Sequence, residues 1–393
     1  MRTHGKNRRH LLSLLLFASL VLLFPLKAEG KVRQRIEPKI PDIPGYLTLK
    51  CDFHMHTVFS DGRVWPPIRA EEAWRDGLDA FSVTDHIEYQ PFKDDVKRDL
   101  NRSHELALPV ANELGLMLVK GAEITKEVPP GHFNALFLKD CNPLDKEDYL
   151  DCIGAAIEQG AFVFWNHPPF RQKDNQSIWH PEHTVVYEKG WLHGIEVVNG
   201  SDYYPKAHRW CIEKNLTLLG TTDIHSPLYF EYDPEHGDRR PMTLVFATAK
   251  TEAAVKEALF ARRTAVYSKN SLYGEKRFLE PIFNQSIEIV NPEVTIKGTG
   301  GAGVQVRNRS DIPYRLIADS EVEELDFTKK ITLQPDAVVI VWVKGKSEKL
   351  AGEREVSLPY RVENLCPAPE EALPVVLKLR VTFVPVAKEE EKK

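Results

Sequence analysis

Two histidines separated by one residue follow the first strongly apolar run of the chain. Residues two apart on a strand point to the same side, so His54 and His56 can direct both imidazoles at one metal ion. Asp61 follows in a Ser-Asp-Gly turn and can offer a carboxylate to an adjacent ion. A His-x-His pair alone is weak evidence, because such pairs are often structural. The pair becomes stronger evidence for a metal site if further candidate ligands occur at the ends of later strands.

Further imidazoles and carboxylates recur where later apolar runs end. These candidate ligands are His86, Glu123, His167, Asp223 and His225. Catalytic groups of α/β barrels gather at the carboxyl ends of the strands, whose loops share one rim, and these positions fit that rule. His132 stands at the start of an apolar run, so this rule does not place it at the rim formed by the carboxyl ends of the strands. Each residue alone could be a hydrogen-bonded core histidine or a loop carboxylate, but the whole set predicts one site.

The donor types narrow the chemistry of this site. Nine nitrogen and oxygen donors without a cysteine suit Zn²⁺, Mn²⁺ or Fe²⁺, and do not suit an iron–sulfur cluster or Cu⁺. Closely spaced divalent ions stabilise the attacking and leaving oxygens of a displacement at phosphorus, and they lower the pKa of a bound water to about 7. The set therefore favours hydrolysis of a phosphate ester.

The elements that would position these residues alternate along the chain. The predicted strands are Leu47–Phe53, Ala80–Thr84, Leu116–Gly121, Phe133–Leu138, Ala161–Trp165, Gly194–Val198, Leu216–Thr221 and Thr243–Ala247. The predicted helices cover residues 66–76, 93–114, 146–159, 205–214 and 251–262. Such alternation predicts an α/β fold with a mainly parallel sheet. Seven or eight units of this kind favour a closed or distorted barrel over an open sheet.

The pattern changes after Lys269. Strand-like runs separated by Gly, Pro and Asp turns predict a small all-β sandwich over residues 282–386, and we expect no helix within it. The glycine cluster at 298–303 lacks a following helix and a Gly-Lys-Ser/Thr ending, so it indicates a loop and not a phosphate cradle. Residues 387–393 form a charged tail.

The N-terminal segment is typical of a signal peptide. Residues 1–30 combine a basic start, the apolar run Leu11–Leu26 and small residues at a cleavage position, which predicts secretion, to the periplasm. An uncleaved anchor is the alternative. Residues 31–47 carry three prolines and predict an extended lead-in. Five cysteines without C-x-x-C spacing exclude a disulfide scaffold, although Cys141 and Cys152 could either pair or stay free.

The composition excludes several classes of protein. The 393 residues carry 52 Lys+Arg and 57 Asp+Glu, a formal net charge of −5, which argues against a nucleic-acid partner. Removal of the basic leader would make the charge more negative. A hydrophobic fraction of 42% builds a real core and does not suit a multi-span membrane protein, so no stable span is expected after signal cleavage.

The ordered set His-x-His, Asp, Asp-His, Glu, His, His and Asp-x-His resembles the PHP (polymerase and histidinol phosphatase) family of metal-dependent phosphoesterases, and its surroundings look most like secreted members from Bacteroidetes-type bacteria. The resemblance implies a distorted (β/α)₇ barrel over residues 48–270 that holds up to three divalent ions. It implies these ligands: His54, His56, Glu123 and Asp223 for the first ion; Asp61, His86 and His225 for the second; Glu123, His132 and His167 for the third. Several relatives have a histidine in place of Asp61, and a carboxylate there biases the site toward harder ions.

The resemblance also suggests a reaction. A hydroxide bridging the first two ions would attack the phosphoryl group, the third ion would hold a non-bridging oxygen, and the ester would leave as an alcohol. We expect Asp223 and His225 to be catalytic. Arg171, just after the His167 loop, either grips the phosphate as a third catalytic residue or is a solvated loop arginine.

Residues around the ligands have less defined roles. We expect Asp85 to orient a ligand histidine, Arg240 to face the rim, and Arg263 to cap a helix end. Surface or hydrogen-bonding roles are expected for the remaining histidines: His180, His183, His193, His208 and His236. Pocket-wall or core positions are expected for the aromatic residues Trp65, Trp165, Trp179, Trp191, Tyr203 and Tyr204.

The leading functional hypothesis is a secreted phosphoesterase that acts on a small phosphomonoester. Hydrolysis of a nucleotide or phosphodiester by the same fold is the first alternative, and hydrolysis of an amide or lactone is another. A non-catalytic protein that binds a ligand through the metal pocket belongs to a different class, and the complete ligand set weighs against it. The substrate, the metal in vivo, the leaving-group acid, the oligomeric state and the role of the β domain stay open.

Overall fold

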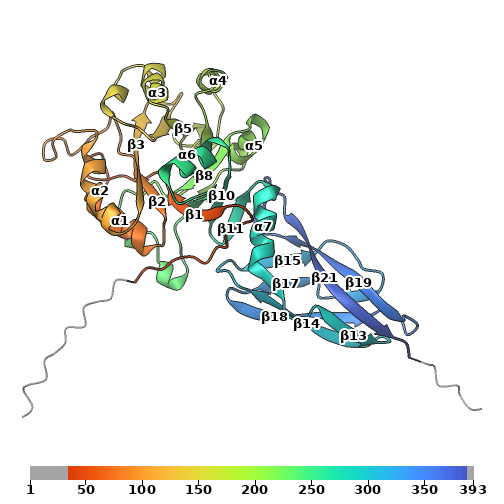
Figure 1. Ribbon diagram of the computed structural model, residues 1–393. Coiled ribbons are helices and arrows are strands. Elements are labelled where there is room, and N and C mark those ends of the chain that lie inside the picture. Colours follow the sequence, from red (N-terminus) through yellow and green to blue (C-terminus); the bar gives the residue numbers. More distant parts are fainter. Residues whose placement is uncertain (1–33, 387–393) are drawn as a thin grey trace, which may run out of the picture. The chain divides into compact units, whose positions relative to one another are not determined.

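The structure is a computed structural model that describes residues 34–386 (Figure 1). The predicted signal peptide and the charged tail lie outside the described residues. Residues 35–386 fall within one compact unit. Across this described part of the chain, no helix has both the length and the apolar character needed to span a membrane.

The described chain alternates strands and helices up to α7 and then consists of strands. The helices are α1 (Pro66–Arg75), α2 (Arg102–Glu113), α3 (Tyr149–Glu158), α4 (Pro181–Glu188), α5 (Pro205–Lys214), α6 (Glu252–Phe260) and α7 (Lys276–Ser286). The strands of the first part are β1 (Leu47–Asp52), β2 (Ala80–Val83), β3 (Met117–Thr125), β4 (His132–Leu136), β5 (Phe162–Trp165), β6 (Gly194–Asn199), β7 (Asp202–Tyr203), β8 (Thr217–Thr221), β9 (Met242–Ala247), β10 (Thr264–Ser268) and β11 (Ser271–Gly274). Those of the second part are β12 (Ile287–Ile289), β13 (Glu293–Lys297), β14 (Gly301–Asn308), β15 (Tyr314–Ala318), β16 (Leu325–Phe327), β17 (Lys330–Leu333), β18 (Ala337–Gly345), β19 (Gly352–Val362), β20 (Leu365–Cys366) and β21 (Leu373–Val384).

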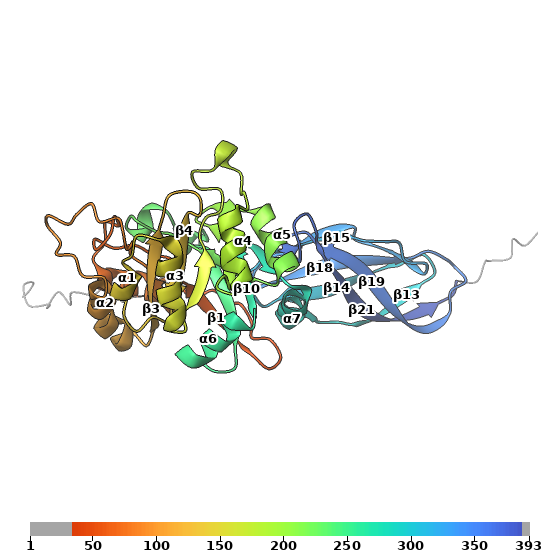
Figure 2. The same cartoon turned by 90° about the horizontal axis from the view of Figure 1, so that it is seen from above.

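The first part is built on one large mixed sheet. Its strand order is β20-β11-β10-β9-β1-β2-β3-β4-β5-β6-β7, with β8 paired to β6. β1, β2 and β3 are parallel, as are β5, β6 and β8, but β4 is antiparallel to both of its neighbours. β9 is antiparallel to β1 and β10. In Figure 2, α3, α4, α5 and α6 are arranged around these strands.

These pairings confirm the α/β class and correct its details. All eight predicted runs fall on strands, because each is apolar and buried on both faces. The mainly parallel sheet is wrong, since β4, β9 and β10 run antiparallel to their neighbours. The predicted (β/α)₇ barrel is not confirmed by this mixed sheet.

The helices differ from the prediction at three places. α2 begins at Arg102 and not near residue 93, because residues 91–100 are polar and lack an apolar face. α4 was not predicted, and α7 ends at Ser286, inside the span expected to lack helices. The buried Phe278, Leu279, Ile282 and Phe283 of α7 have helical spacing, which the interior Pro281 obscures.

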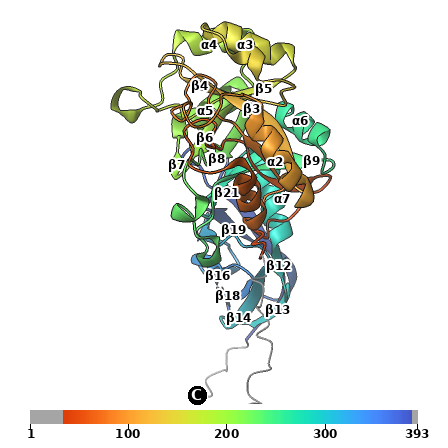
Figure 3. The same ribbon diagram turned by 90° about the vertical axis from the view of Figure 1, so that its left-hand side faces the viewer.

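The C-terminal part is all-β from β12 onward, as predicted (Figure 3). A four-stranded sheet, β12-β14-β18-β16, and a five-stranded sheet, β13-β21-β19-β15-β17, form it within the described residues. Residues of β21 alternate strictly between buried and exposed, as expected when one face of a sheet covers a core. β20 leaves this part and pairs in parallel with β11, so the two parts share a sheet edge.

Candidate metal centre

The ends of β1 and β8 bring the first candidate ligands together. His54 and His56 follow β1, and Asp223 and His225 follow β8. The Asp223 N–H donates to the His54 carbonyl at 2.9 Å, and the His56 N–H donates to the Ile224 carbonyl at 3.1 Å. All nine predicted ligands fall into groups whose donor atoms lie within 4.8 Å of one another.

His132 reaches the same place through the antiparallel direction of β4. The register sets His132 opposite Thr125, so β4 begins where β3 ends. His132 Nδ1 lies 3.0 Å from Glu123 Oε1. The carboxyl-end rule applies to parallel strands, and it failed for His132 because β4 runs the other way.

Four donor atoms converge at the centre of the cluster. The Nε2 atoms of His54 and His56 lie 3.1 Å apart, and Asp223 Oδ1 lies 3.2 Å from the first and 2.9 Å from the second. Glu123 Oε2 lies 3.5 and 3.4 Å from the same two nitrogens and 2.7 Å from His86 Nδ1, and none of these contacts has hydrogen-bond geometry. Ligands at about 2.1 Å from a tetrahedral ion would be separated by roughly 3.4 Å. These residues therefore fit a divalent ion.

A second group surrounds Asp61. Its Oδ1 lies 3.1 Å from His225 Nε2, 3.5 Å from His86 Nε2 and 3.9 Å from His56 Nδ1, and it is also buried without a hydrogen-bond partner. His225 Nδ1–H donates to the Asp223 carbonyl at 2.7 Å, which leaves Nε2 available as a ligand. This group also fits a cation.

Glu123 links the two groups to the remaining histidines. Its Oε1 lies 3.0 Å from His132 Nδ1 and 3.5 Å from His167 Nε2, and it accepts from Asn166 Nδ2 at 2.9 Å. Distance alone gives two further sets, which differ from those that the resemblance implies: His86, Glu123 and His132; and His54, His167 and Asp223. Glu123 is thus the carboxylate shared most widely in the cluster.

Glu196 was missed by sequence analysis. This fully buried residue of β6 accepts from His54 Nδ1 at 2.7 Å and from Thr221 Oγ1 at 2.6 Å through Oε1. Its Oε2 accepts from the His167 N–H at 2.6 Å and from Asn199 Nδ2 at 2.9 Å. The first contact holds His54 with Nε2 free for a metal, as carboxylate–histidine–metal arrangements do. The sequence did offer one signal for Glu196, because it is a charged residue inside the otherwise apolar strand β6.

Two buried networks hold the loops that carry the ligands. Arg240, expected at the rim, is instead fully buried and contacts Asp52 at 3.2 Å and Asp76 at 3.0 Å. Asp52 in turn accepts from Thr222 Oγ1 at 2.6 Å and from the His54 N–H at 3.3 Å. Arg240 therefore positions both ligand loops from below and does not face substrate.

Asp85 contacts the loop that carries His56, which agrees with the expectation that it orients a candidate ligand histidine. It accepts from the Thr57 N–H at 2.7 Å and from Ser60 Oγ at 2.8 Å, and Ser60 Oγ lies 3.2 Å from His56 Nδ1. Two ligands also adopt positive φ, Asp223 at 54° and His167 at 26°. Such conformations are strained for non-glycine residues and are often kept for function.

Charged groups within the cluster shift the pKa values of their neighbours. Burial lowers the pKa of His54, but Asp223, Glu196 and Glu123 outweigh it and raise the pKa well above its usual value. Burial is likewise outweighed at His86, where Glu123 and Asp61 raise the pKa to about 9. Burial raises the pKa of Glu123, but the surrounding histidines outweigh it and hold the pKa well below its usual range. Carboxylates and imidazoles this close together form an environment that favours bound cations.

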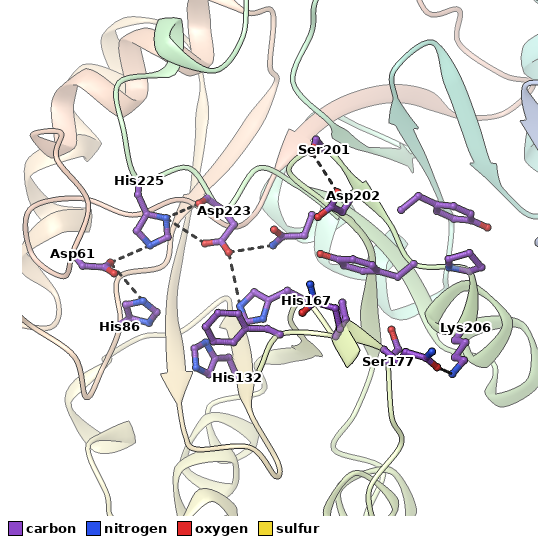
Figure 4. A pocket seen from close by; sticks show the side chains of 18 residues that line it. Asp61, His86, His132, His167, Ser177, Ser201, Asp202, Lys206, Asp223 and His225 are labelled. Atoms are coloured by element: carbon purple, nitrogen blue, oxygen red, sulfur yellow. Dashed lines mark hydrogen bonds and ion pairs between the residues drawn. The ribbon is translucent and has the colours of Figure 1, made fainter. Parts of the chain in front are cut away.

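A cavity of about 980 Å³ opens above the cluster (Figure 4). Its lining on the metal side is Asp61, His86, His132, His167, Asp223 and His225. The rest is lined by Pro169, Phe170, Asn199 and by residues 175–177 and 201–206. Tyr203 and Tyr204 are pocket-wall residues, whereas Trp165 is buried in the core.

Arg171 is not among the lining residues, which favours the second of its two interpretations, a solvated loop arginine. Its φ of 53° turns the chain, its side chain is 62% exposed, and its guanidinium lies 3.6 Å from Glu127. Among the described residues, Lys206 is the basic side chain other than histidine that lines the cavity. Nothing in the spacing of the sequence distinguished Lys206 from other surface lysines.

Other minor expectations are settled by the contacts. Cys141 and Cys152 are free thiols. Arg263 caps α6 through its backbone, whose N–H donates to the Ala258 carbonyl at 2.9 Å, while its side chain pairs with Glu257 and donates to the Phe246 carbonyl. The spare histidines have hydrogen-bonding partners outside the cluster, such as the Pro130 carbonyl for His183.

Comparison with solved structures decides the family. A crystal structure of a two-domain protein from Bacteroides vulgatus, described as containing a predicted PHP-like metal-dependent phosphoesterase, is 44% identical in sequence. The match covers 88% of this chain and 99% of that chain, with a TM-score of 0.83. The chain belongs to the family of PHP-like metal-dependent phosphoesterases. The resemblance found in the sequence is therefore confirmed.

The C-terminal part of this PHP-like chain is matched separately. A family model described as an Ig-like domain covers residues 287–378, which agrees with the all-β region. No curated protein matches the chain. A Bifidobacterium adolescentis protein, itself assigned only by prediction as a metal-dependent phosphoesterase, matches at 17% identity over 44% of this chain and 87% of its own, with a TM-score of 0.37. That likeness carries no argument about the site.

Proposed function

We propose that the chain hydrolyses a small phosphomonoester, with water added across the P–O bond and an alcohol and inorganic phosphate released. The observation that supports this most strongly is the pair of buried carboxylate oxygens, Glu123 Oε2 and Asp61 Oδ1. They make no hydrogen bond of good geometry, and their nearest neighbours are histidine nitrogens, His86 Nδ1 at 2.7 Å from the first and His225 Nε2 at 3.1 Å from the second. Buried anionic oxygens without partners are costly unless a cation satisfies them.

The nine ligands would hold up to three divalent ions of Zn, Mn or Fe. The proposed sets are His54, His56, Glu123 and Asp223; Asp61, His86 and His225; and Glu123, His132 and His167. When bound, such ions neutralise charge on the phosphoryl oxygens and lower the pKa of water to about 7.

The surrounding residues prepare this site before substrate arrives. Glu196 fixes the tautomer of His54, and Asn199 donates to Asp223 Oδ2 at 3.3 Å, which turns Oδ1 toward the two histidines. His225 keeps Nε2 toward Asp61 by donating Nδ1–H to a backbone carbonyl. We infer that Asp223 and His225 act in catalysis as ligands whose metal-binding atoms are held in place by these hydrogen bonds. The leader supports the further proposal that the enzyme acts after export, in the periplasm.

The proposal is tested by phosphate release from phosphorylated sugars, amino alcohols, nucleotides and diesters. Protein without its leader is reconstituted separately with Mn²⁺, Zn²⁺ and Fe²⁺, and metal content is measured alongside. Asp223→Asn should abolish release and lower metal content, whereas Asp233→Asn, an exposed acid outside the cavity, should change neither. A metal-loaded protein that releases no phosphate from any compound would overturn the proposal, and equal rates in Asp223→Asn would overturn the role of the cluster.

A further inference from the structure

The wall of the cavity opposite the metal cluster has its own chemistry. Figure 4 places Lys206 and Ser177 on the side away from Asp61 and His225. This wall is built from the loop after β5 and from residues 201–206, which run from just before β7 into the first turn of α5. Its amide and hydroxyl side chains are Asn175, Gln176, Ser177, Ser201, Tyr203 and Tyr204. Asp202 adds one carboxylate, which accepts from Ser201 Oγ at 3.3 Å. A phosphate held at the cluster would leave this polar wall for the rest of the substrate.

Lys206 is the permanent positive charge of that wall. Its Nζ donates to Gln176 Oε1 at 2.9 Å, a contact that joins the two segments. No carboxylate within the described residues forms an ion pair with it. Arg171, the basic residue of the loop after β5 that sequence analysis singled out, does not line the cavity and lies beside Glu127. The wall therefore presents one ammonium group that forms no ion pair within the described residues, because Asp202, the carboxylate of the same wall, is not paired with it.

The charge of this wall limits what it can recognise. One ammonium group balances one negative charge, which suits a carboxylate, whereas a phosphate dianion favours two or more cationic partners. The volume of about 980 Å³ lies at the upper end of the range for small-molecule sites, so the cavity has room for a group beyond the scissile phosphate. The neutral amides and hydroxyls suit hydroxyl groups between the two ends of a substrate.

We propose that the substrate is a phosphorylated hydroxy acid or sugar acid, whose carboxylate binds Lys206 while its phosphate ester lies at the metal cluster. This inference rests on the proposed phosphomonoesterase activity and adds the substrate class. Gln176 holds the ammonium group in place, and it would keep its contact when the carboxylate binds, because Nζ carries three donors.

Two matched pairs of compounds test the inference: phosphoglycerate against glycerol phosphate, and phosphogluconate against sorbitol phosphate. Within each pair a carboxylate replaces a hydroxymethyl group. The metal-loaded enzyme should favour the acid in kcat/KM, and Lys206→Gln should lower kcat/KM for the acid roughly 10- to 100-fold, as expected for a lost charged hydrogen bond. For the neutral partner it should change little. Lys206→Arg should restore most of the preference, because it keeps the charge.

The control is Arg209→Gln, an exposed basic residue one turn further along α5 that does not line the cavity. It should alter neither member of a pair. Equal rates for both members in the wild type, or an equal loss for both in Lys206→Gln, would overturn the inference and leave the phosphatase intact. A stronger preference for a sugar bisphosphate, also abolished by Lys206→Gln, would replace the carboxylate with a second phosphate and overturn it as well.

If no compound is hydrolysed, affinity still decides the matter. Calorimetric titration of phosphogluconate and sorbitol phosphate into the metal-loaded protein measures the carboxylate preference without turnover. Tighter binding of the acid that Lys206→Gln removes would support the inference while the phosphatase proposal fails. Equal affinities would overturn the inference about the carboxylate, in addition to the phosphatase proposal that the absence of hydrolysis has already overturned.

Discussion

The chain contains two sets of buried histidines that differ in what surrounds them. In the metal cluster, imidazoles face carboxylates and one another, as at His54 and His56 with Nε2 atoms 3.1 Å apart. His183 and His208 are equally buried, but burial lowers their pKa values to about 3 and about 4. His183 donates Nε2–H to the Pro130 carbonyl at 2.7 Å and stacks on Trp165.

The difference separates a packing role from a binding role. A buried imidazole with a backbone acceptor stays neutral and completes the core, as His183 does. The cluster leaves Glu123 Oε2 and Asp61 Oδ1 without hydrogen-bond partners, which a core built only for stability would avoid. The cluster should therefore depend on added cations, and the core histidines should not.

Metal removal should give the largest effect. A chelator should lower activity by at least about 10³-fold, because loss of several kcal/mol of transition-state stabilisation has that size. It should also lower the free energy of unfolding by about 2.7 kcal/mol relative to protein with free ion at 100 times its Kd. Activity and thermal unfolding before and after chelation, with re-addition of Mn²⁺ or Zn²⁺, measure both.

His183→Gln serves as the comparison for that experiment. It removes a core imidazole but leaves the cluster intact, so the chelator should cause the same losses as in the wild type. An unfolding temperature that ions do not change in the wild type would contradict the cluster's dependence on cations.

Glu196→Gln should have the next largest effect, because it touches the cluster only through His54 and the His167 backbone. An amide can accept from His54 Nδ1, but its NH₂ group would then face the donors at Oε2, the His167 N–H and Asn199 Nδ2. We expect metal affinity or activity to fall about 10- to 100-fold, the range for partners of ligand histidines. Metal titration and steady-state kinetics measure it, and unchanged values would assign Glu196 to packing alone.

Sequence spacing predicted the candidate ligands, which the structure brings into one cluster, but not the residues that hold them in place. His54, His56, Asp223 and His225 follow strands with local patterns, so their place at one rim could be predicted. Glu196 and His54 lie 142 residues apart, and only the pairing of strands brings them into contact. The sequence left the role of Arg171 open, because closeness to His167 along the chain does not say where its side chain lies, and in the structure that side chain lies beside Glu127 and does not line the cavity.

The fold shows the same limit. The apolar runs predicted every strand of the α/β sheet that carries a ligand, because burial on both faces leaves a clear local pattern. The apolar character of β4 says nothing about its direction, since an antiparallel strand is as apolar as a parallel one. The signal for its direction is the connection from β3, residues 126–131, which is too short for a parallel crossover. It was that direction which placed His132 at the cluster.

The acid stability of the metal-free protein should distinguish the core histidines. The unfolded chain binds a proton at His183 below about pH 6.5, whereas the folded chain resists it down to about pH 3, so stability is lost as the pH falls through this window. His183→Gln should flatten the dependence by up to about 1.4 kcal/mol per pH unit. Denaturant titrations at a series of pH values measure the slope, and an unchanged slope would mean that His183 titrates alike in both states.

Substitution of His236, an exposed histidine outside both sets, should have the smallest effect on stability and activity. The His236 side chain is exposed, and its hydrogen bond to Asp233 raises its pKa, followed by the charge of the same carboxylate. A raised folded pKa adds stability at acidic pH that fades as the pH rises through it, the opposite sign to His183. Water and salt screen this pair, so His236→Asn should leave activity and the unfolding midpoint within experimental error at physiological ionic strength. A clear shift at neutral pH would mean that an exposed imidazole contributes more than its surroundings explain, and burial would no longer separate the histidine roles.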